Sequence, residues 1–344
     1  MRVKAVILAG GEGKRLKCVT GDMPKPLVPL LGRSMMEHII LLLRSCGITQ
    51  ICAAVKYRAQ DIISAFSDGS ALGVELCYRT EDEPLGTAGA VKNCADFYGG
   101  EDFVVISGDA ACDFDLRALC RRHVQSGALV TVALRREHDP LRFGLAVTDE
   151  RGDIRGFVEK PDWGGVVSDL VNTGIYVLSP RAMEYVPQCA PFDFAKDLFP
   201  LLLRRGEKIS SLVMEGYWCD VGTPLSYYRC CADALEGKLR ITPAPQFVPA
   251  PPQGERERPD EHAAAVMDFP CRDRAAAMGA LSRLMLEMDA DYSDGIRLAV
   301  KDGSVHISPR AEEEAIRVAV DASDAEFASS LALSAGDIIR AIDG

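Results

Sequence analysis

The sequence predicts an α/β protein with a doubly wound, mixed but mostly parallel sheet, followed by a small C-terminal α+β domain. Three observations favour this architecture. Apolar strands alternate with helical segments through the first 240 residues, a glycine-rich turn follows the first strand, and a proline-rich stretch sets off the C-terminal part. Because strands that alternate with helices are joined by right-handed crossovers, they form a largely parallel sheet with a ligand crevice at the carboxyl ends.

Short apolar runs between turn residues predict strands, and apolar residues at helical spacing predict helices. Ser34 and Glu37 form a capping-box pattern, and Gly47 ends the helix that follows. In the first half we expect strands at 5–8, 51–55, 74–78, 103–106 and 129–134, and helices at 34–44, 59–66, 87–94 and 116–125. In the strand-rich second half we expect strands at 143–147, 154–160, 171–178 and 211–214, a strand or tight loop at 217–223, and helices at 194–204 and 225–236.

The composition predicts three parts along the chain. Residues 1–240 form the α/β domain, residues 241–262 are a proline-rich, semi-rigid linker, and residues 263–344 form the second domain. In this second domain we expect helices at 273–288 and 325–342 and strands at 296–300, 305–308 and 316–320.

Charge and composition narrow the function classes. The net charge of −11 and the pI near 5.1 argue against broad binding to nucleic acid or to an anionic membrane. No apolar run reaches about 18 residues and no signal-peptide pattern precedes the first strand, so neither a membrane span nor secretion is expected. The 12 cysteines lack any CxxC spacing and the 5 histidines lack metal-like spacing. We therefore expect a cytoplasmic protein with small-molecule ligands.

The glycine-rich turn after the first strand predicts a phosphate site. Gly10, Gly11 and Gly13 carry no Cβ, so backbone N–H groups can approach an anion closely. Arg15 offers a planar fork for phosphate oxygens, and Lys25 adds a compact charge at the same strand end. The spacing fits neither a P-loop nor a dinucleotide fingerprint. The turn suits a nucleoside triphosphate.

The longer string resembles the signature of the sugar-1-phosphate nucleotidyltransferases. That signature is written L-A-G-G-x-G-T-R-L followed by P-K-P-L, and the chain keeps it except for Lys14 in place of Thr. The resemblance covers about the first 240 residues and implies a Rossmann-like catalytic domain. It implies nucleotide contacts from Leu8, Gly10, Gly11 and Gly13. The pattern is most similar to the bacterial mannose-1-phosphate guanylyltransferases fused to a phosphohexomutase-like region.

Two aspartates match the metal ligands of this family. Asp109 follows Gly108 after an apolar strand, and Asp220 lies in the W-x-D-V-G pattern. Two carboxylates with substrate oxygens and water suit Mg²⁺. The resemblance therefore implies Mg²⁺ on Asp109 and Asp220, with Gly108 lining the nucleotide.

The segment that begins at Glu81 resembles the base-recognition motif E-x-x-P-L-G-T-A-G, which includes Gly86 and Thr87. A carboxylate only accepts hydrogen bonds, and guanine offers N1–H and N2–H side by side, whereas uracil and thymine place a single N–H between two acceptors. Glu81 therefore favours GTP. A solvated acidic turn is the alternative interpretation.

The strand-rich half resembles the sugar-phosphate side of the family. Glu159 and Lys160 lie in an F-x-E-K-P motif, with Asn172 and Gly174 as its partner motif and Gly144 allowing close backbone approach. The resemblance implies that Glu159 and Asn172 bind sugar hydroxyls and that Lys160 binds the sugar phosphate.

The C-terminal part resembles the last domain of phosphohexomutases. Its loop departs from the family pattern R-P-S-x-T-E-P, because Ser308 replaces the Arg and residues 312–314 are three glutamates. Negative charge there would repel a phosphate. We expect no mutase activity from this domain.

The resemblance implies transfer of a nucleotidyl group from an NTP to a sugar 1-phosphate, with catalysis by Arg15, Lys25, Asp109 and Lys160. The favoured pair is GTP with mannose 1-phosphate, in nucleotide-sugar and polysaccharide biosynthesis. The alternatives are UTP with glucose 1-phosphate, GTP with heptose 1-phosphate, and a non-catalytic regulatory or sugar-nucleotide-sensing subunit. We expect a homo-oligomer that binds neither nucleic acid nor membrane.

Overall fold

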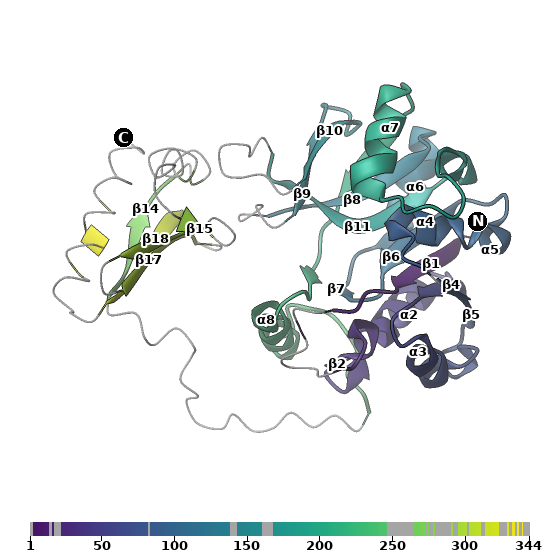
Figure 1. Ribbon diagram of the computed structural model, residues 1–344, viewed down its shortest axis with the longest axis horizontal. Helices are drawn as coiled ribbons and strands as arrows, with labels where there is room; N and C mark the ends of the chain where they lie inside the picture. Colours follow the sequence, from purple (N-terminus) through teal and green to yellow (C-terminus); the bar gives the residue numbers. More distant parts are fainter. Residues whose placement is uncertain are drawn as a thin grey trace. The chain divides into compact units, whose positions relative to one another are not determined.

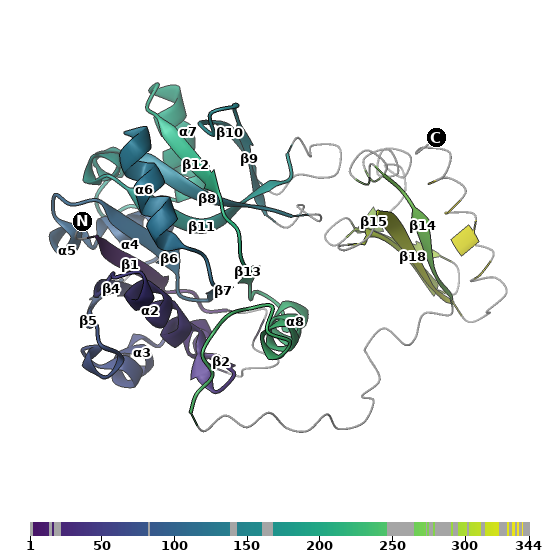
Figure 2. The same cartoon turned by 180° about the vertical axis from the view of Figure 1, so that it is seen from behind.

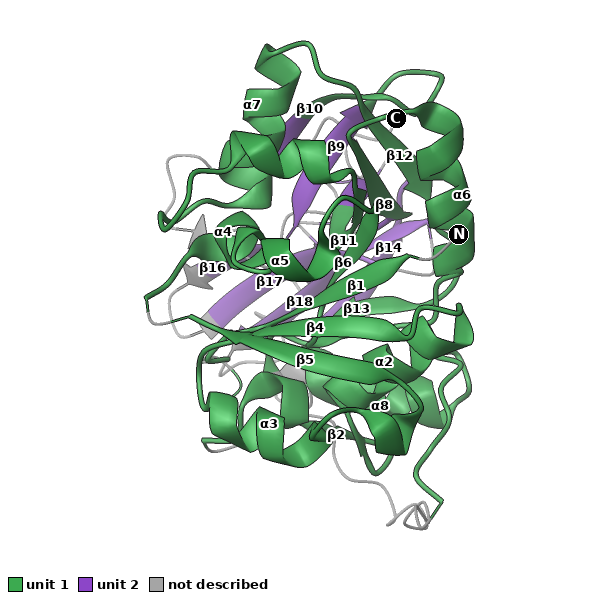
Figure 3. Ribbon diagram, turned by 90° about the vertical axis from the view of Figure 1, so that its right-hand side faces the viewer, with its two compact units in different colours: residues 1–135, 148–156, 172–249 green, residues 136–147, 157–171, 250–344 purple. Residues whose placement is uncertain are grey.

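The structure is a computed structural model of the 344-residue chain. It describes residues 3–13, 16, 22–81, 83–137, 143–159, 168–245, 265–272, 274, 278, 290–291, 295–300, 303–310, 314–322, 329, 332–333, 336 and 339. The chain divides into two compact units, which Figure 3 colours separately: residues 1–135, 148–156 and 172–249, and residues 136–147, 157–171 and 250–344.

The main sheet has nine described strands with the path β10-β9-β11-β6-β1-β4-β5, and β8 pairs with both β11 and β12 (Figures 1 and 2). Their bounds are β1 Lys4–Ala9, β4 Gln50–Val55, β5 Glu75–Thr80, β6 Phe103–Ser107, β8 Val130–Arg136, β9 Gly144–Thr148, β10 Ile154–Glu159, β11 Leu170–Leu178 and β12 Ile209–Val213. Strand β1 pairs in parallel with β4 and β6, β4 with β5, and β8 with β12, while β11 runs antiparallel to β6 and β9. The predicted mixed, mostly parallel sheet is confirmed.

Helices cover both faces of this sheet, with α4 and α5 on one side of β1 and β4 and α2 and α3 on the other (Figure 3). The α-helices are α2 Met35–Ser45, α3 Ala59–Phe66, α4 Gly86–Lys92, α5 Ala95–Tyr98, α6 Leu116–Ser126, α7 Phe199–Arg204 and α8 Pro224–Leu235. Short 3-10 helices are η2 Lys25–Leu27, η3 Ser70–Leu72 and η6 Pro180–Tyr185, and η7 Phe194–Leu198 is a π-helical turn. The predicted cap is present, because the Glu37 amide donates to Ser34 Oγ at 3.2 Å.

The central strands are the buried core of the fold. Ala5, Val6 and Ile7 of β1 and all the residues from Phe103 to Ile106 of β6 have no exposed surface. A strand with apolar side chains on both faces requires helices on both sides. Site residues at the ends of β1, β4 and β6 thus follow buried central strands, whereas Glu81 follows the partly exposed strand β5.

The C-terminal sheet has the described order β14-β18-β17-β16-β15, with every pair antiparallel. Its strands are β14 Ala265–Pro270, β15 Ala290–Asp291, β16 Ile296–Val300, β17 Gly303–Pro309 and β18 Ala315–Ala322. The small extra domain predicted from the sequence is thus present, and three of its strands were predicted. Strands β14 and β15 were missed, because β14 is an edge strand that ends in Pro270 and β15 has only 2 residues.

One face of the C-terminal sheet is closed by helical residues. Met278, Ala332 and Ile339 are fully buried against strand residues such as Ile307 and Val318. The described residues at 274, 278, 329, 332–333, 336 and 339 are helical. The rest of the predicted helices, and most of the acidic loop at 311–314, lie outside the described residues.

The predicted linker begins in contact with the main sheet's unit. The Ala244 amide donates to Leu31 O at 3.0 Å, and Arg33 Nε donates to Thr242 O at 3.1 Å. Residues 246–262 lie outside the described part of the chain. The boundaries 1–240, 241–262 and 263–344 stay a prediction.

The start of α4 requires glycine at position 86. Gly86 has a φ of +69°, and a Cβ there would lie 2.6 Å from Phe192 O. We expect Gly86→Ala to lower the free energy of unfolding by about 2–4 kcal/mol, the sum of a left-handed alanine and an overpacked contact. Urea denaturation measures this loss.

The matched control is Gly127→Ala, because Gly127 has a left-handed backbone with a φ of +61° and no described atom within 4 Å of the added Cβ. This variant should lose about 1 kcal/mol, from the backbone conformation alone. Equal losses in the two variants would contradict the close contact between Gly86 and Phe192.

Candidate active site

The glycine turn lies at the carboxyl end of β1, at the edge of the sheet where ligands bind in α/β proteins. Gly11 is exposed, and no described atom lies within 4 Å of the position its Cβ would take. Gly13 has a φ of +65°, and a Cβ there would come within 3.2 Å of Lys25 Cβ. The turn thus leaves room for a ligand on one side and packs against the Lys25 stem on the other.

Leu8 and Gly108 join the ends of the two neighbouring strands. The Gly108 amide donates to Leu8 O at 2.9 Å. A Cβ at Gly108 would lie 2.9 Å from Ile7 Cγ2, so this close approach needs glycine. The contact fixes the position of the residue that follows, Asp109, relative to the glycine turn.

Lys25 brings the two predicted metal ligands together. Its Nζ lies 2.7 Å from Asp109 Oδ2 and 3.5 Å from Asp220 Oδ1. The three side chains come from segments far apart in the chain. The side chain of Lys25 is 11% exposed, so this ion pair lies at the edge of the interior rather than in open solvent.

A short ladder holds Asp220 beside Asp109. Strand β7 (Ala110–Cys112) pairs antiparallel with β13 (Trp218–Asp220), and this register sets Asp220 opposite Ala110. Asp109 directly precedes β7, and Ser107 Oγ donates a hydrogen bond to its carboxylate. The two carboxylates therefore meet because their backbones are paired.

Helix α8 supports the segment after Asp220. Thr223 and Ser226 form a capping box at its start, and the Gly222 amide donates to Ser226 Oγ at 3.1 Å. Tyr217 OH donates to Asp233 Oδ2 at 2.8 Å on the same helix. These contacts hold both ends of β13.

The electrostatics of this trio favour a cation. Burial lowers the pKa of Lys25, but Asp109 and Asp220 outweigh it, so the pKa rises above its ordinary value of 10.5. Two neighbouring carboxylates repel one another unless a positive charge lies between them. Oxygen ligands of this kind fit Mg²⁺, which needs only one or two protein carboxylates beside substrate oxygens and water. Among the described residues no larger cluster of His, Cys, Asp and Glu could hold a metal.

Glu81 lies at the same edge of the sheet, just after β5. Its Oε2 accepts from the Leu85 amide at 3.1 Å, and its Oε1 would lie 3.5 Å from a Cβ on Gly10. Burial raises the pKa of Glu81, against the lowering effects of the Leu85 amide and the charge of Lys56. Glu81 is half-buried beside the glycine turn, whereas Glu83 is exposed. The burial of Glu81 favours a binding role over a solvated acidic turn.

The start of α4 is held by the segment around Phe192. Phe192 O accepts from the amides of Ala88 and Gly89 at 2.9 and 3.0 Å. Thr87 Oγ1 donates to Asp193 Oδ2 at 2.8 Å and accepts from the Phe194 amide at 3.0 Å. The hydroxyl of Thr87, predicted to bind nucleotide, is therefore engaged by protein partners.

The predicted sugar-phosphate residues are only partly described. Asn172 Oδ1 accepts from the Gly174 amide at 3.0 Å, and Gly174 has a φ of +74°. In the other unit, Gly144 begins β9 and Glu159 ends β10. Lys160, Arg15 and Lys14 lie outside the described residues, as does the side chain of Glu159.

Sequence reasoning missed Lys56, which directly follows β4. In the register of the sheet it lies between Gly10 and Glu81, since Val55 pairs with both Ala9 and Thr80. The signal was present in the sequence: a charged residue directly after a buried strand marks the ligand edge of a parallel sheet. No family motif contains Lys56.

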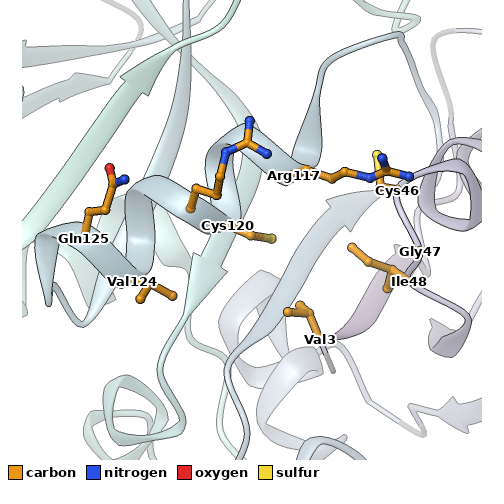
Figure 4. A pocket seen from close by; sticks show the side chains of 9 residues that line it. Val3, Cys46, Gly47, Ile48, Arg117, Cys120, Val124 and Gln125 are labelled. Atoms are coloured by element: carbon orange, nitrogen blue, oxygen red, sulfur yellow. The ribbon is translucent and has the colours of Figure 1, made fainter. Parts of the chain in front are cut away.

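A cavity of about 390 Å³ lies away from this edge. Val3 and Ile48 line it and precede β1 and β4, so it is at the amino ends of the strands. Side chains of helix α6, among them Arg117 and Cys120, form its other wall (Figure 4). It is not part of the site around Lys25.

Two buried histidines, His38 and His123, make hydrogen-bonding contacts within the fold. His38 Nε2 lies 2.8 Å from Leu30 O, and His123 Nδ1 lies 2.9 Å from Thr131 Oγ1. Burial lowers the pKa of both rings. Neither lies with other potential ligands in a metal-like group among the described residues.

The profile of the family described as nucleotidyl transferase matches residues 4–237. The chain belongs to this family. The matched nucleotidyl transferase region contains the glycine turn, Lys25, Glu81 and both aspartates, and it ends before the C-terminal sheet begins at Ala265. Among the described residues, no helix has the length and apolar character of a membrane span.

Two relatives and one solved structure illustrate the similarity. The chain is 34% identical over 256 residues to a UTP–glucose-1-phosphate uridylyltransferase of Synechocystis sp., covering 71% of this chain and 66% of the relative. It is 35% identical over 245 residues to a mannose-1-phosphate guanylyltransferase of Mycobacterium tuberculosis, covering 71% and 67%. The structure of HddC from Yersinia pseudotuberculosis complexed with GMP-PN is 29% identical, with a TM-score of 0.59, and covers 67% of this chain and 99% of that one. The chain thus spans about two thirds of the length of these two sequence relatives.

The raised pKa of Lys25 generates a pH-dependent prediction. We expect Lys25→Met to lower the free energy of unfolding by about 1–3 kcal/mol near neutral pH, because it leaves Asp109 and Asp220 without a cation. A raised lysine pKa stabilises the fold fully below pH 10.5, and this contribution is lost as the pH rises through the folded-state value. Urea denaturation in chelator, repeated across pH, should show the gap to wild type shrinking only above pH 10.5.

The control for this series is Lys208→Met, whose partner Asp153 lies 3.3 Å away and whose side chain is 45% exposed. Such a pair contributes about 0–1 kcal/mol. A Lys25→Met gap that did not change with pH would show that the charge of Lys25 is not what stabilises the site.

Proposed function

We propose that the chain transfers a guanylyl group from GTP to mannose 1-phosphate, giving GDP-mannose and pyrophosphate with Mg²⁺ as cofactor. The observation that carries this proposal is the Lys25 ammonium between Asp109 and Asp220, at the carboxyl edge of the sheet and beside the glycine turn. Positive charge, two carboxylates and open backbone amides in one place suit a triphosphate and its counter-ion.

The chemistry is an in-line displacement at phosphorus. An oxygen of the sugar phosphate forms a bond to the α-phosphorus of the nucleotide, the bond from that phosphorus to the bridging oxygen breaks, and pyrophosphate leaves. No covalent enzyme intermediate is required, so the protein acts by positioning the reactants and compensating charge. Lys25 and the amides of residues 10–13 bind and orient the phosphates in this mechanism.

Asp109 and Asp220 would hold the Mg²⁺ ion. When bound, the ion compensates the charge of the α-phosphate and of the departing pyrophosphate. Arg15 and Lys160, which lie outside the described residues, are proposed to supply further positive charge. Asn172, Glu159, Gly144 and Gly174 are the proposed sugar contacts.

The choice of guanine rests on Glu81, whose carboxylate lies beside the glycine turn. The guanylyltransferase of Mycobacterium tuberculosis and the GMP-PN complex of HddC support it. The uridylyltransferase of Synechocystis sp. favours UTP with glucose 1-phosphate as the second candidate. The presence of Lys25 with both aspartates favours an enzyme over a regulatory subunit, since a sensor has no need of metal ligands. A cytoplasmic homo-oligomer, and a C-terminal domain without mutase activity, stay predictions.

The direct test is a pyrophosphate-release screen of the four NTPs and dTTP against mannose, glucose and heptose 1-phosphates, with Mg²⁺ and with EDTA. The proposal predicts Mg²⁺-dependent release that is fastest for GTP with mannose 1-phosphate. Absence of release with every pair would favour the regulatory alternative.

The two aspartates generate a sharper prediction. We expect Asp109→Asn and Asp220→Asn each to lower kcat by at least about 100-fold, since each removes one charge from the metal site. Steady-state pyrophosphate release measures kcat, and thermal denaturation checks that each variant is folded.

Asp96→Asn is the control, because Asp96 is an exposed residue of α5 that pairs with Arg79 and is not among the predicted metal ligands. Its kcat should match that of wild type. If Asp109→Asn and Asp220→Asn both kept the wild-type kcat, the proposal that these residues hold Mg²⁺ would be contradicted.

A further inference from the structure

Three residues occupy equivalent positions at the ligand edge of the sheet. Ala9 pairs with Val55 and Val55 pairs with Thr80, so the next residue on each parallel strand falls in the same row. That row is Gly10, Lys56 and Glu81. Paired residues of parallel strands direct their side chains to the same face.

Lys56 and Glu81 border the space that Gly10 leaves empty. A Cβ on Gly10 would lie 3.4 Å from Lys56 Cβ and 3.5 Å from Glu81 Oε1. Tyr57 N donates to Gly10 O at 3.5 Å, which holds the backbone after β4 against the glycine turn. The stem of Lys56 and one carboxylate oxygen of Glu81 therefore face one small volume.

Within the described part of the chain, no hydrogen bond or ion pair holds the Lys56 ammonium. Its charge acts on Glu81 through space. Glu81 is itself fixed by the Leu85 amide through Oε2 at 3.1 Å, which leaves Oε1 turned toward Gly10 and Lys56. Glu81 is thus a positioned hydrogen-bond acceptor, and the Lys56 ammonium next to it is a hydrogen-bond donor on a flexible stem.

The Watson–Crick edge of guanine has the complementary pattern. O6 accepts a hydrogen bond, and N1–H and N2–H donate. Glu81 satisfies the two donors, but O6 needs a donor next to that carboxylate, and a lysine ammonium is one of the side-chain groups that commonly bind it.

We propose that Lys56 is a specificity-determining residue that donates to O6 of guanine beside Glu81. This inference rests on the proposed use of GTP and extends it to a residue outside the family motifs. Lys56 rejects bases that carry an amino group at this position, adenine and cytosine, because two donors would face one another. Glu81 rejects uracil and thymine, whose carbonyl oxygens would face its carboxylate.

The test compares GTP with 2,6-diaminopurine riboside triphosphate, which has an amino group in place of O6 and an unprotonated N1. Because the change at N1 affects the contact with Glu81 in the wild type and in the Lys56 variants alike, the effect of substituting Lys56 reports on O6. Lys56→Met is expected to lower kcat/KM for GTP by about 10- to 100-fold, the scale of one charged hydrogen bond. It should not lower kcat/KM for the diaminopurine nucleotide. The selectivity ratio, which is kcat/KM for GTP divided by kcat/KM for the diaminopurine nucleotide, therefore falls by the same factor. Lys56→Arg keeps a donor and should recover most of the ratio.

Lys208→Met is the matched control. Lys208 is an exposed residue that directly precedes β12, and it pairs with Asp153. Its selectivity ratio should equal that of wild type. An unchanged ratio in Lys56→Met, or a wild-type preference for UTP over GTP, would overturn the inference while leaving nucleotidyl transfer intact.

If the wild type turns over no NTP, the proposed function fails separately. Calorimetric titration of the same variants with GDP and with the diaminopurine diphosphate then decides the inference. The inference is supported if Lys56→Met is the only variant that binds GDP more weakly. It is overturned if the wild type binds GDP and the diaminopurine diphosphate equally well.

Discussion

Lys25 lies against Asp109 and Asp220, and the candidate active site depends on this ion pair. Two carboxylates held side by side by the β7–β13 ladder need a positive charge between them. The Lys25 side chain, packed on Gly13, supplies that charge from the turn that also presents the backbone amides. The contacts of Lys25 with Asp109 and Asp220 thus join the glycine turn, the end of β6 and the segment after β12 into a single site.

Under the proposed function, this arrangement would let a divalent ion replace the Lys25 ammonium. An ammonium on a flexible four-carbon stem can move away from a carboxylate when a divalent ion and triphosphate arrive. The carboxylates themselves stay in place, because their positions follow from backbone pairing and from the capped start of helix α8. Under the proposed function, Lys25 would pair with the two aspartates before substrate binds and would turn to the phosphates afterwards.

Much of this could be predicted from the sequence, and the exceptions have physical causes. Strands such as β1 and β6 are continuous apolar runs, and their burial on both faces makes them easy to recognise. Asp109 and Asp220 were expected together only from a resemblance, since a ladder of 3 residues leaves no periodic signal. The partners of Thr87 come from residues 193 and 194, about a hundred positions later, and no local pattern could show them. The sequence shows that Lys56 directly follows a buried strand, but only the strand register shows that it lies between Gly10 and Glu81.

A Mn²⁺ titration followed by electron paramagnetic resonance tests the exchange of cations most directly. In the nucleotide-free protein, Lys25→Met should bind Mn²⁺ more tightly than the wild type, because the ammonium no longer competes for Asp109 and Asp220. Asp109→Asn in the same background should abolish that gain. Equal Mn²⁺ affinity in the wild type and Lys25→Met, or a gain that survives Asp109→Asn, would contradict a cation site between these carboxylates.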